Sequence, residues 1–249
     1  MKKIYQSPLP YYDERLHDIC ALVLHCSTHD ADEMVEVLRE KQLSSHYIIG
    51  LDGKIIQPVD DAKRAWHAGV SRWREMDNLN HYSIGIEISS PSMGQESYRD
   101  AQICNLIWLC RRLIRKYRIP PVNVVAHSDV APQRKPDPGL MFPWQYLADS
   151  GVGLWYDLSD AKKVSEDDPA KLLSVIGYNI ENISAASYAF CRHFLPQLVE
   201  KCSDIKWLLD NVYPSDYVFP LQYINVLKAC AYKYSLLKNT KMRSIRSKK

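Results

Sequence analysis

A nearly continuous apolar run near the start of the chain most constrains the fold. The segment ALVLHCS, residues 21–27, is apolar at nearly every position, so a strand formed by it would present apolar side chains on both faces. Such strands lie inside a sheet that is covered on each side. The run therefore predicts a layered α/β structure.

Further strand and helix patterns fill the first 155 residues. Asp52-Gly53 favours a hairpin turn between two short apolar segments. We expect Ser97 to open a long helix with Asp100 as its capping-box partner, and Pro120-Pro121 to end it. The expected elements are a helix over 31–43, a hairpin over 45–59, a strand over 82–89, the helix from 97 and a strand over 122–127. They predict a mixed central β-sheet flanked by helices.

The pattern changes after this first domain, residues 1–156. Residues 157–169 are polar and predict a linker, and three later segments with helical spacing predict a small three-helix domain over residues 170–238. Residues 239–249 are rich in Lys and Arg and contain no acid, which is typical of a solvated basic tail. His193 stands alone on one of the predicted helices, so we expect it to be a packing or surface residue rather than a metal ligand.

Strict alternation over residues 83–89 divides this predicted strand into two faces. The two sets are Ile84, Ile86 and Ile88 on one face, and Ser83, Gly85, Glu87 and Ser89 on the other. The second set surrounds a single acid, Glu87, with small or polar side chains. That face is either the floor of a cleft or an ordinary solvent-facing surface, and this segment alone favours neither.

Two histidines and one aspartate are candidate metal ligands. His25 lies near the end of the apolar run and His127 ends another apolar segment, where a neutral imidazole needs a hydrogen bond or a metal ion. Asp137 lies between two prolines, which restrict its backbone. Two imidazoles and one carboxylate leave a fourth position open on tetrahedral zinc, the pattern of a catalytic site. For His25 alone, a hydrogen-bonded core histidine is the other interpretation, and Cys26 points to the opposite face.

Several motifs, in order along residues 20–155, resemble one enzyme family. They are LHCS, SSHYIIGLDGKIIQPV, AWHAG, NHYSIGIEI and NVVAHSDVAPQRKPDPG. Together they are similar to the zinc N-acetylmuramoyl-L-alanine amidases of the AmpD/AmiD type, which are related to phage T7 lysozyme and the peptidoglycan recognition proteins. The resemblance is nearest to the AmiD branch. Through LLSVIGYNI and FCRHFLP it extends more weakly into the second domain, which resembles a three-helix, peptidoglycan-binding-like domain.

The resemblance implies a fold, a function and a site. The fold would be that of T7 lysozyme and the peptidoglycan recognition proteins. His25, His127 and Asp137 would ligate one Zn2+, with water as the fourth ligand. Glu87 would be the acid–base residue, and Lys135 would stabilise the oxyanion. The substrate would be the amide between the lactyl group of N-acetylmuramic acid and L-alanine, in peptidoglycan or a muropeptide.

Five further residues could flank the sugar or the peptide of such a substrate. Tryptophan stacks on a pyranose ring, and arginine binds a carboxylate. The predicted substrate-binding residues are His67, Trp66, Arg72, Trp73 and Asn80. A packing or loop role is equally consistent with the sequence around them.

Composition and length bear on partners and location. A net charge of +3 with 24% charged residues gives no case for nucleic acid. No apolar stretch approaches the roughly 20 residues of a membrane span, and no signal peptide is visible. The protein would be cytoplasmic if this N-terminus is native, and in the cell envelope or periplasm if a leader was removed.

The seven scattered cysteines predict free thiols.

Other functions compete with a cell-wall degrading or recycling amidase. A recognition protein would bind muropeptides without cutting them, but in non-catalytic relatives the zinc ligands are degraded, whereas they are intact here. A phage-type endolysin would share the first domain, and the resemblance of the second domain to AmiD disfavours it. A different zinc peptidase lacks support, because the chain has no H-E-x-x-H helix.

Overall fold

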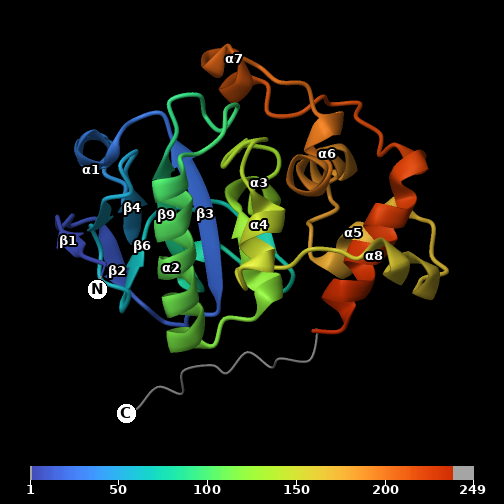
Figure 1. Ribbon diagram of the computed structural model, residues 1–249, viewed down its shortest axis with the longest axis horizontal. Coiled ribbons are helices and arrows are strands. Elements are labelled where there is room, and N and C mark those ends of the chain that lie inside the picture. Colours follow the sequence, from blue (N-terminus) through green and yellow to red (C-terminus); the bar gives the residue numbers. More distant parts are fainter. Residues whose placement is uncertain (1, 238–249) are drawn as a thin grey trace.

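The computed structural model describes residues 2–237 and confirms the mixed α/β architecture (Figure 1). The main sheet has the order β1-β5-β4-β9-β3-β10, in which β4, β9, β3 and β10 are parallel and β5 is antiparallel to β4. Its strands are β1 (Ile4–Gln6), β3 (Ala21–Ser27), β4 (Tyr47–Ile49), β5 (Ile55–Gln57), β9 (Ser83–Ser89) and β10 (Val124–Ala126). Two short ribbons pair β2 (Tyr12–Glu14) with β6 (Lys63–Ala65), and β7 (Arg72–Trp73) with β8 (Met76–Asp77).

Helices cover both faces of this sheet. The α-helices are α1 (Ala31–Glu40), α2 (Asp100–Tyr117), α3 (His127–Val130), α4 (Trp144–Asp149), α5 (Pro169–Ile176), α6 (Ile183–Phe194), α7 (Ile205–Asp210) and α8 (Ile224–Ser235). The 3-10 helices are η1 (Leu79–His81), η2 (Pro121–Asn123), η3 (Leu158–Lys163), η4 (Pro196–Leu198) and η5 (Leu221–Tyr223). Within residues 2–237, no helix combines the length and the apolar character needed to cross a bilayer.

The predicted covered strand is β3, an interior strand of the sheet whose residues 21–26 are all buried. The aliphatic face of β3 and β9 packs against α2, which lies along the sheet in Figure 1. The opposite face carries His25 and Glu87, which are paired in register on the two neighbouring strands. The alternation in the sequence thus separates an apolar face, which forms the core, from a polar face, which carries the candidate site residues His25 and Glu87.

Two helix boundaries differ from the prediction. α1 ends at Glu40, before Leu43, which the helix predicted over residues 31–43 included and which is 43% exposed. α2 begins at Asp100 with Arg99 as its N-cap residue, and the Gln102 side chain accepts a hydrogen bond from the Arg99 N–H at 3.1 Å. The capping box predicted for Ser97 is therefore wrong, because Gln102 supplies the acceptor three residues after a later N-cap.

The C-terminal helices pack directly against the first part of the chain. The three predicted helices are α5, α6 and α8, and the short α7 was not predicted. One apolar core joins Trp73 and Val125 of the first part to Leu173, Phe190 and Leu227 of these helices. Figure 1 shows the helices beside the sheet, next to α3 and α4. The helical module, residues 169–237, is thus fixed to the sheet domain by shared apolar burial.

The segment between the two parts is also ordered in part. Residues 158–163, inside the predicted linker, form η3, which packs against α8. Asp160 of η3 is 5% exposed and forms ion pairs with Lys163 and Lys233. The basic tail predicted over residues 239–249 lies outside the described residues.

Candidate metal centre

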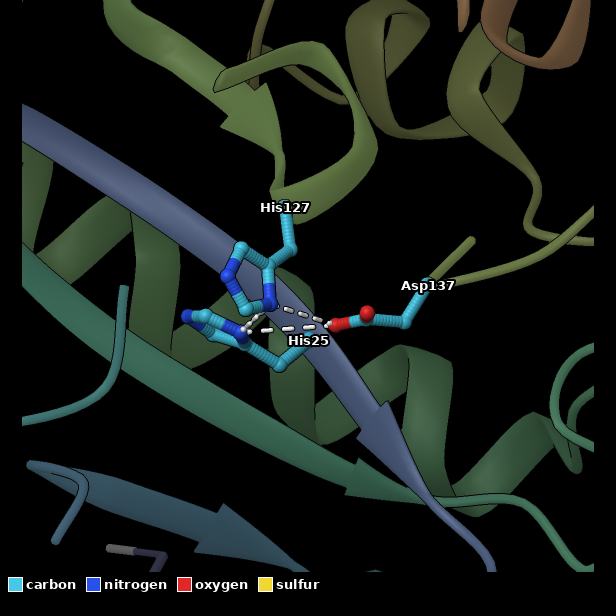
Figure 2. Close-up of side chains that lie close together, drawn as sticks. All are labelled: His25, His127 and Asp137. Atoms are coloured by element: carbon cyan, nitrogen blue, oxygen red, sulfur yellow. Dashed lines mark hydrogen bonds and ion pairs between the residues drawn. The ribbon is translucent and has the colours of Figure 1, made fainter. Parts of the chain in front are cut away.

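Three side chains from separate segments converge on the polar face of the sheet (Figure 2). His25 comes from β3, and Asp137 from the loop after α3. His127 is the first residue of α3, because β10 ends one residue earlier than predicted. The Nδ1 atoms of the two histidines are 2.8 Å apart, and Asp137 Oδ2 lies 3.0 Å from His127 Nδ1 and 3.4 Å from His25 Nδ1. All three residues are buried, with at most 4% exposure.

This donor set fits a divalent metal ion. The ligand atoms of a tetrahedral zinc with bonds of about 2.0–2.1 Å lie about 3.3 Å apart, close to the three separations between these atoms. Buried atoms with lone pairs rarely face one another this closely unless a proton or a cation lies between them. Three protein ligands leave a fourth position for water or substrate, which is the arrangement of catalytic zinc sites.

A contact behind the His127 ring determines which of its nitrogens faces the cluster. His127 Nε2 lies 3.2 Å from the main-chain oxygen of Ala68. A carbonyl oxygen only accepts, so the ring proton is on Nε2 and the Nδ1 lone pair is free for a metal ion. The loop that contains Ala68 therefore orients one predicted ligand.

His67 orients the other histidine. Its Nδ1 lies 2.9 Å from His25 Nε2, and its Nε2 lies 3.2 Å from Ser83 Oγ, whose hydroxyl donates to the Leu79 carbonyl at 2.6 Å. With Ser83 donating to Leu79, the His67 Nε2–H donates to Ser83 Oγ, and the His25 Nε2–H donates to His67 Nδ1. His25 then carries its proton on Nε2, which leaves its Nδ1 lone pair free. We predicted that His67 contacts substrate, but both of its ring nitrogens are occupied inside the protein. The structure therefore places His67 behind His25, a predicted metal ligand, with both of its ring nitrogens bonded to protein atoms.

The absence of a side chain at Gly85 leaves room for the His67 ring. A Cβ atom at this position would lie 2.4 Å from His67 Cγ, so the Gly85→Ala side chain would displace the ring and break its contact with His25. Loss of such an outer contact typically costs 10–100-fold in metal affinity. We expect a zinc dissociation constant raised by about that factor, measured by competition with a chromophoric chelator. Unchanged affinity in a folded variant would show that His67 does not orient His25.

The protonation states of two predicted ligands suit metal binding. Burial lowers the pKa of the His25 imidazole to about 4, so the ring is neutral at pH 7. Burial alone would raise the pKa of the Asp137 carboxyl, but the two histidines outweigh it and hold that pKa well below its usual range. The cluster thus offers a neutral imidazole and a carboxylate, the forms that bind metal ions.

Glu87 and Lys135 lie beside this cluster. Glu87 Oε1 is 4.0 Å from His25 Nδ1, and its side chain is 14% exposed. Burial raises the pKa of Glu87 to about 8; the Asp137 carboxylate adds to this shift and the Lys135 cation opposes it. A glutamate whose pKa is close to neutral can both accept and donate a proton at pH 7. Lys135 is partly buried on the loop that carries Asp137.

Two further predicted substrate-binding residues are buried. Trp73 is 1% exposed, and its indole N–H donates to the Val122 carbonyl at 3.0 Å. Asn80 is 6% exposed, and its Oδ1 accepts from the N–H groups of His67 and Ala68. Of the two roles left open for these residues, substrate contact and packing, the burial and contacts favour packing: Trp73 lies in the core, and Asn80 supports the loop behind the histidines.

Trp66 and Arg72 are more accessible. The Trp66 indole N–H donates to Asp13 at 2.7 Å, and its ring is only partly buried. Arg72 forms ion pairs of 3.5 Å with Asp77 and with Glu181 of the helical module, and it lines a cavity of about 810 Å³. Neither residue is brought into contact with the three converging side chains, so their contacts with substrate stay predictions.

A buried His-His-Asp cluster beside a glutamate, on the polar face of a mixed sheet, is an arrangement typical of metallohydrolases. A family model described as N-acetylmuramoyl-L-alanine amidase matches residues 15–140. The N-acetylmuramoyl-L-alanine amidase AmiD of Escherichia coli is 38% identical over 210 residues, which are 72% of this chain and 76% of that protein. The 1,6-anhydro-N-acetylmuramyl-L-alanine amidase AmpD of the same organism is 43% identical over 103 residues, 41% of this chain and 55% of that protein.

Solved structures extend the similarity to the helical module. The complex of E. coli AmiD with anhydro-N-acetylmuramic acid-L-Ala-D-gamma-Glu-L-Lys has a TM-score of 0.71 and 32% identity, over 87% of this chain and 90% of that chain. AmpDh3 from Pseudomonas aeruginosa has a TM-score of 0.71 and 29% identity, over 92% of this chain and 96% of that chain. The chain belongs to the N-acetylmuramoyl-L-alanine amidase family, which confirms the resemblance found in its motifs.

Proposed function

We propose that this protein is a zinc-dependent amidase that hydrolyses the bond between N-acetylmuramic acid and the L-alanine of a peptidoglycan stem peptide. The convergence of His25, His127 and Asp137 next to Glu87 carries the proposal. Family membership supports the same reaction. The muropeptide bound to E. coli AmiD, anhydro-N-acetylmuramic acid-L-Ala-D-gamma-Glu-L-Lys, supports the substrate class.

The residues divide the reaction between them. Zinc held by His25, His127 and Asp137 would supply Lewis-acid chemistry, which would polarise the scissile carbonyl and let water lose a proton at neutral pH. Glu87 accepts a proton from the attacking water at its carboxylate and donates it to the leaving amide nitrogen of L-alanine. Lys135 places a cation close to the oxygen on which negative charge develops. Asp137 and the two histidines hold their donor atoms in place before substrate arrives.

The experiment uses the purified full chain with zinc and two substrates, a soluble N-acetylmuramoyl tripeptide and intact sacculi. Mass spectrometry should show the free peptide with an N-terminal L-alanine and the sugar with a free lactyl carboxyl group. Treatment with a chelator should abolish cleavage, and added Zn2+ should restore it. Binding of the tripeptide without cleavage by the zinc-loaded protein would instead support a recognition protein.

A further inference from the structure

Two adjacent residues of α6 in the helical module are buried although both carry polar side chains. Arg192 and His193 are each 4% exposed. Burial of a guanidinium costs free energy unless its N–H groups find partners. The hydrogen-bond partners of both side chains lie outside α6, and some of them belong to the segment from His127 to Asp137.

Arg192 contacts the end of this segment. One of its terminal nitrogens donates to the Pro136 carbonyl at 3.2 Å, and the other donates to the Val212 carbonyl at 2.6 Å. Pro136 directly precedes the predicted ligand Asp137. Arg192 thus ties the peptide unit before this ligand to the helical module.

His193 contacts the start of the same segment. Its Nδ1 donates to Asp129 Oδ2 at 2.7 Å, and the same carboxylate oxygen accepts from the Ala126 N–H at 2.8 Å. Tyr178, also in the helical module, donates its hydroxyl to Asp129 Oδ1 at 2.7 Å. Asp129 therefore links the helical module to the backbone on both sides of His127.

A main-chain hydrogen bond also joins the two ends of this segment. The Ser128 N–H donates to the Asp137 carbonyl at 2.9 Å, so the residue after the predicted ligand His127 is bonded to the predicted ligand Asp137. A displacement at either attachment point would then move His127 and Asp137 relative to His25, which is held on β3. Ligand geometry at such a centre depends on a few such contacts.

We propose that Arg192 and His193 are positioning residues of the metal centre, through which the helical module holds His127 and Asp137 in register with His25. The helical module then helps to form the metal site, independently of any ligand that the module binds. This inference rests on the proposed zinc site.

The test measures zinc affinity of the full chain by competition with a chromophoric chelator, and the visible spectrum of the Co2+-substituted protein. Arg192→Met removes both donors, and His193→Phe removes the hydrogen bond while keeping an aromatic ring against Trp144, on which His193 stacks at 3.9 Å. We expect each variant to raise the zinc dissociation constant about 10–100-fold and to change the Co2+ spectrum. Arg192→Lys, which keeps one cationic donor, should fall between Arg192→Met and wild type.

A matched control is Arg74→Met. Arg74 also donates from its guanidinium to a main-chain carbonyl across the two parts, that of Tyr234 at 3.2 Å, but this contact involves α8 and not the His127–Asp137 segment. Its zinc affinity and Co2+ spectrum should equal those of wild type. Thermal unfolding of every variant establishes that it is folded, and His193→Phe tests the inference independently if Arg192→Met does not fold.

The outcomes separate this inference from the proposed function. Folded Arg192→Met and His193→Phe proteins with wild-type zinc affinity and wild-type Co2+ spectra would overturn the inference, even if their thermal stability were lower. An equal loss of zinc affinity in Arg74→Met would also overturn the inference. Weaker packing of the helical module against the sheet domain would then explain the effect, without any particular contact to the His127–Asp137 segment. A wild-type protein that binds no zinc would refute the proposed function itself.

Discussion

Replacement of Glu87 by Gln should lower kcat for muropeptide hydrolysis by about 10²–10⁴-fold, the usual contribution of a general acid–base group, while zinc content stays at the wild-type level. The glutamine keeps the size of the side chain but cannot accept the proton of water. Glu87 Oε1 lies 4.0 Å from His25 Nδ1, which places it beside the three predicted ligands, and it is not a member of their cluster. Activity assays and metal analysis of the same preparation measure both quantities.

A matched control for this prediction is Glu33→Gln, at an exposed glutamate of α1 that pairs with His29. It should retain wild-type activity. If Glu87→Gln also hydrolysed the amide at the wild-type rate, Glu87 would have no part in proton transfer. If Glu87→Gln lost its zinc, the side chain would instead belong to the metal ligands.

Replacement of His127 by Ala should remove zinc and the stability that zinc confers. A ligand that binds only the folded state at 100 times its dissociation constant stabilises that state by about 2.7 kcal/mol. The wild-type thermal midpoint should therefore rise when zinc is added, whereas that of His127→Ala should not move. Calorimetry with and without zinc, together with metal analysis, measures the effect.

The control for this second prediction is His29→Ala, because His29 is only partly buried and lies outside the cluster. Its thermal midpoint should respond to zinc as that of wild type does. Near-normal zinc content in His127→Ala would show that His127 is not a ligand. The zinc response of the thermal midpoint would then have to arise from other residues.

Local patterns in the sequence were sufficient to predict much of the sheet. Alternation along β9 assigns Glu87 to the face opposite the three isoleucines, and the structure has them so. Periodicity does not define the final turn of a helix, and Leu43 was therefore expected in α1 although it lies beyond it. The short helix α7 has only six residues, too few for a periodic pattern.

The site was harder to predict, because its residues are distant in sequence. The residue types of His25, His127 and Asp137 suggested a metal ion, but the pairing of β3 with β10 is needed to bring the two histidines together, and the loop after α3 to bring Asp137 to them. For Trp73 both a substrate contact and a packing role stayed open, because sequence alone does not distinguish a buried tryptophan from one that lines a cleft. The hydrogen bond between His193 and Asp129 could not be predicted, because the two residues lie 64 positions apart in the sequence.

The most direct test of the account is a crystal structure of the zinc-loaded protein with anomalous data collected at the zinc absorption edge. We expect one strong anomalous peak per chain, with His25, His127 and Asp137 as ligands at about 2.0–2.2 Å and one position left for a non-protein ligand. A protein that takes up no zinc, or a peak bound to other residues while these three side chains stay free, would contradict it.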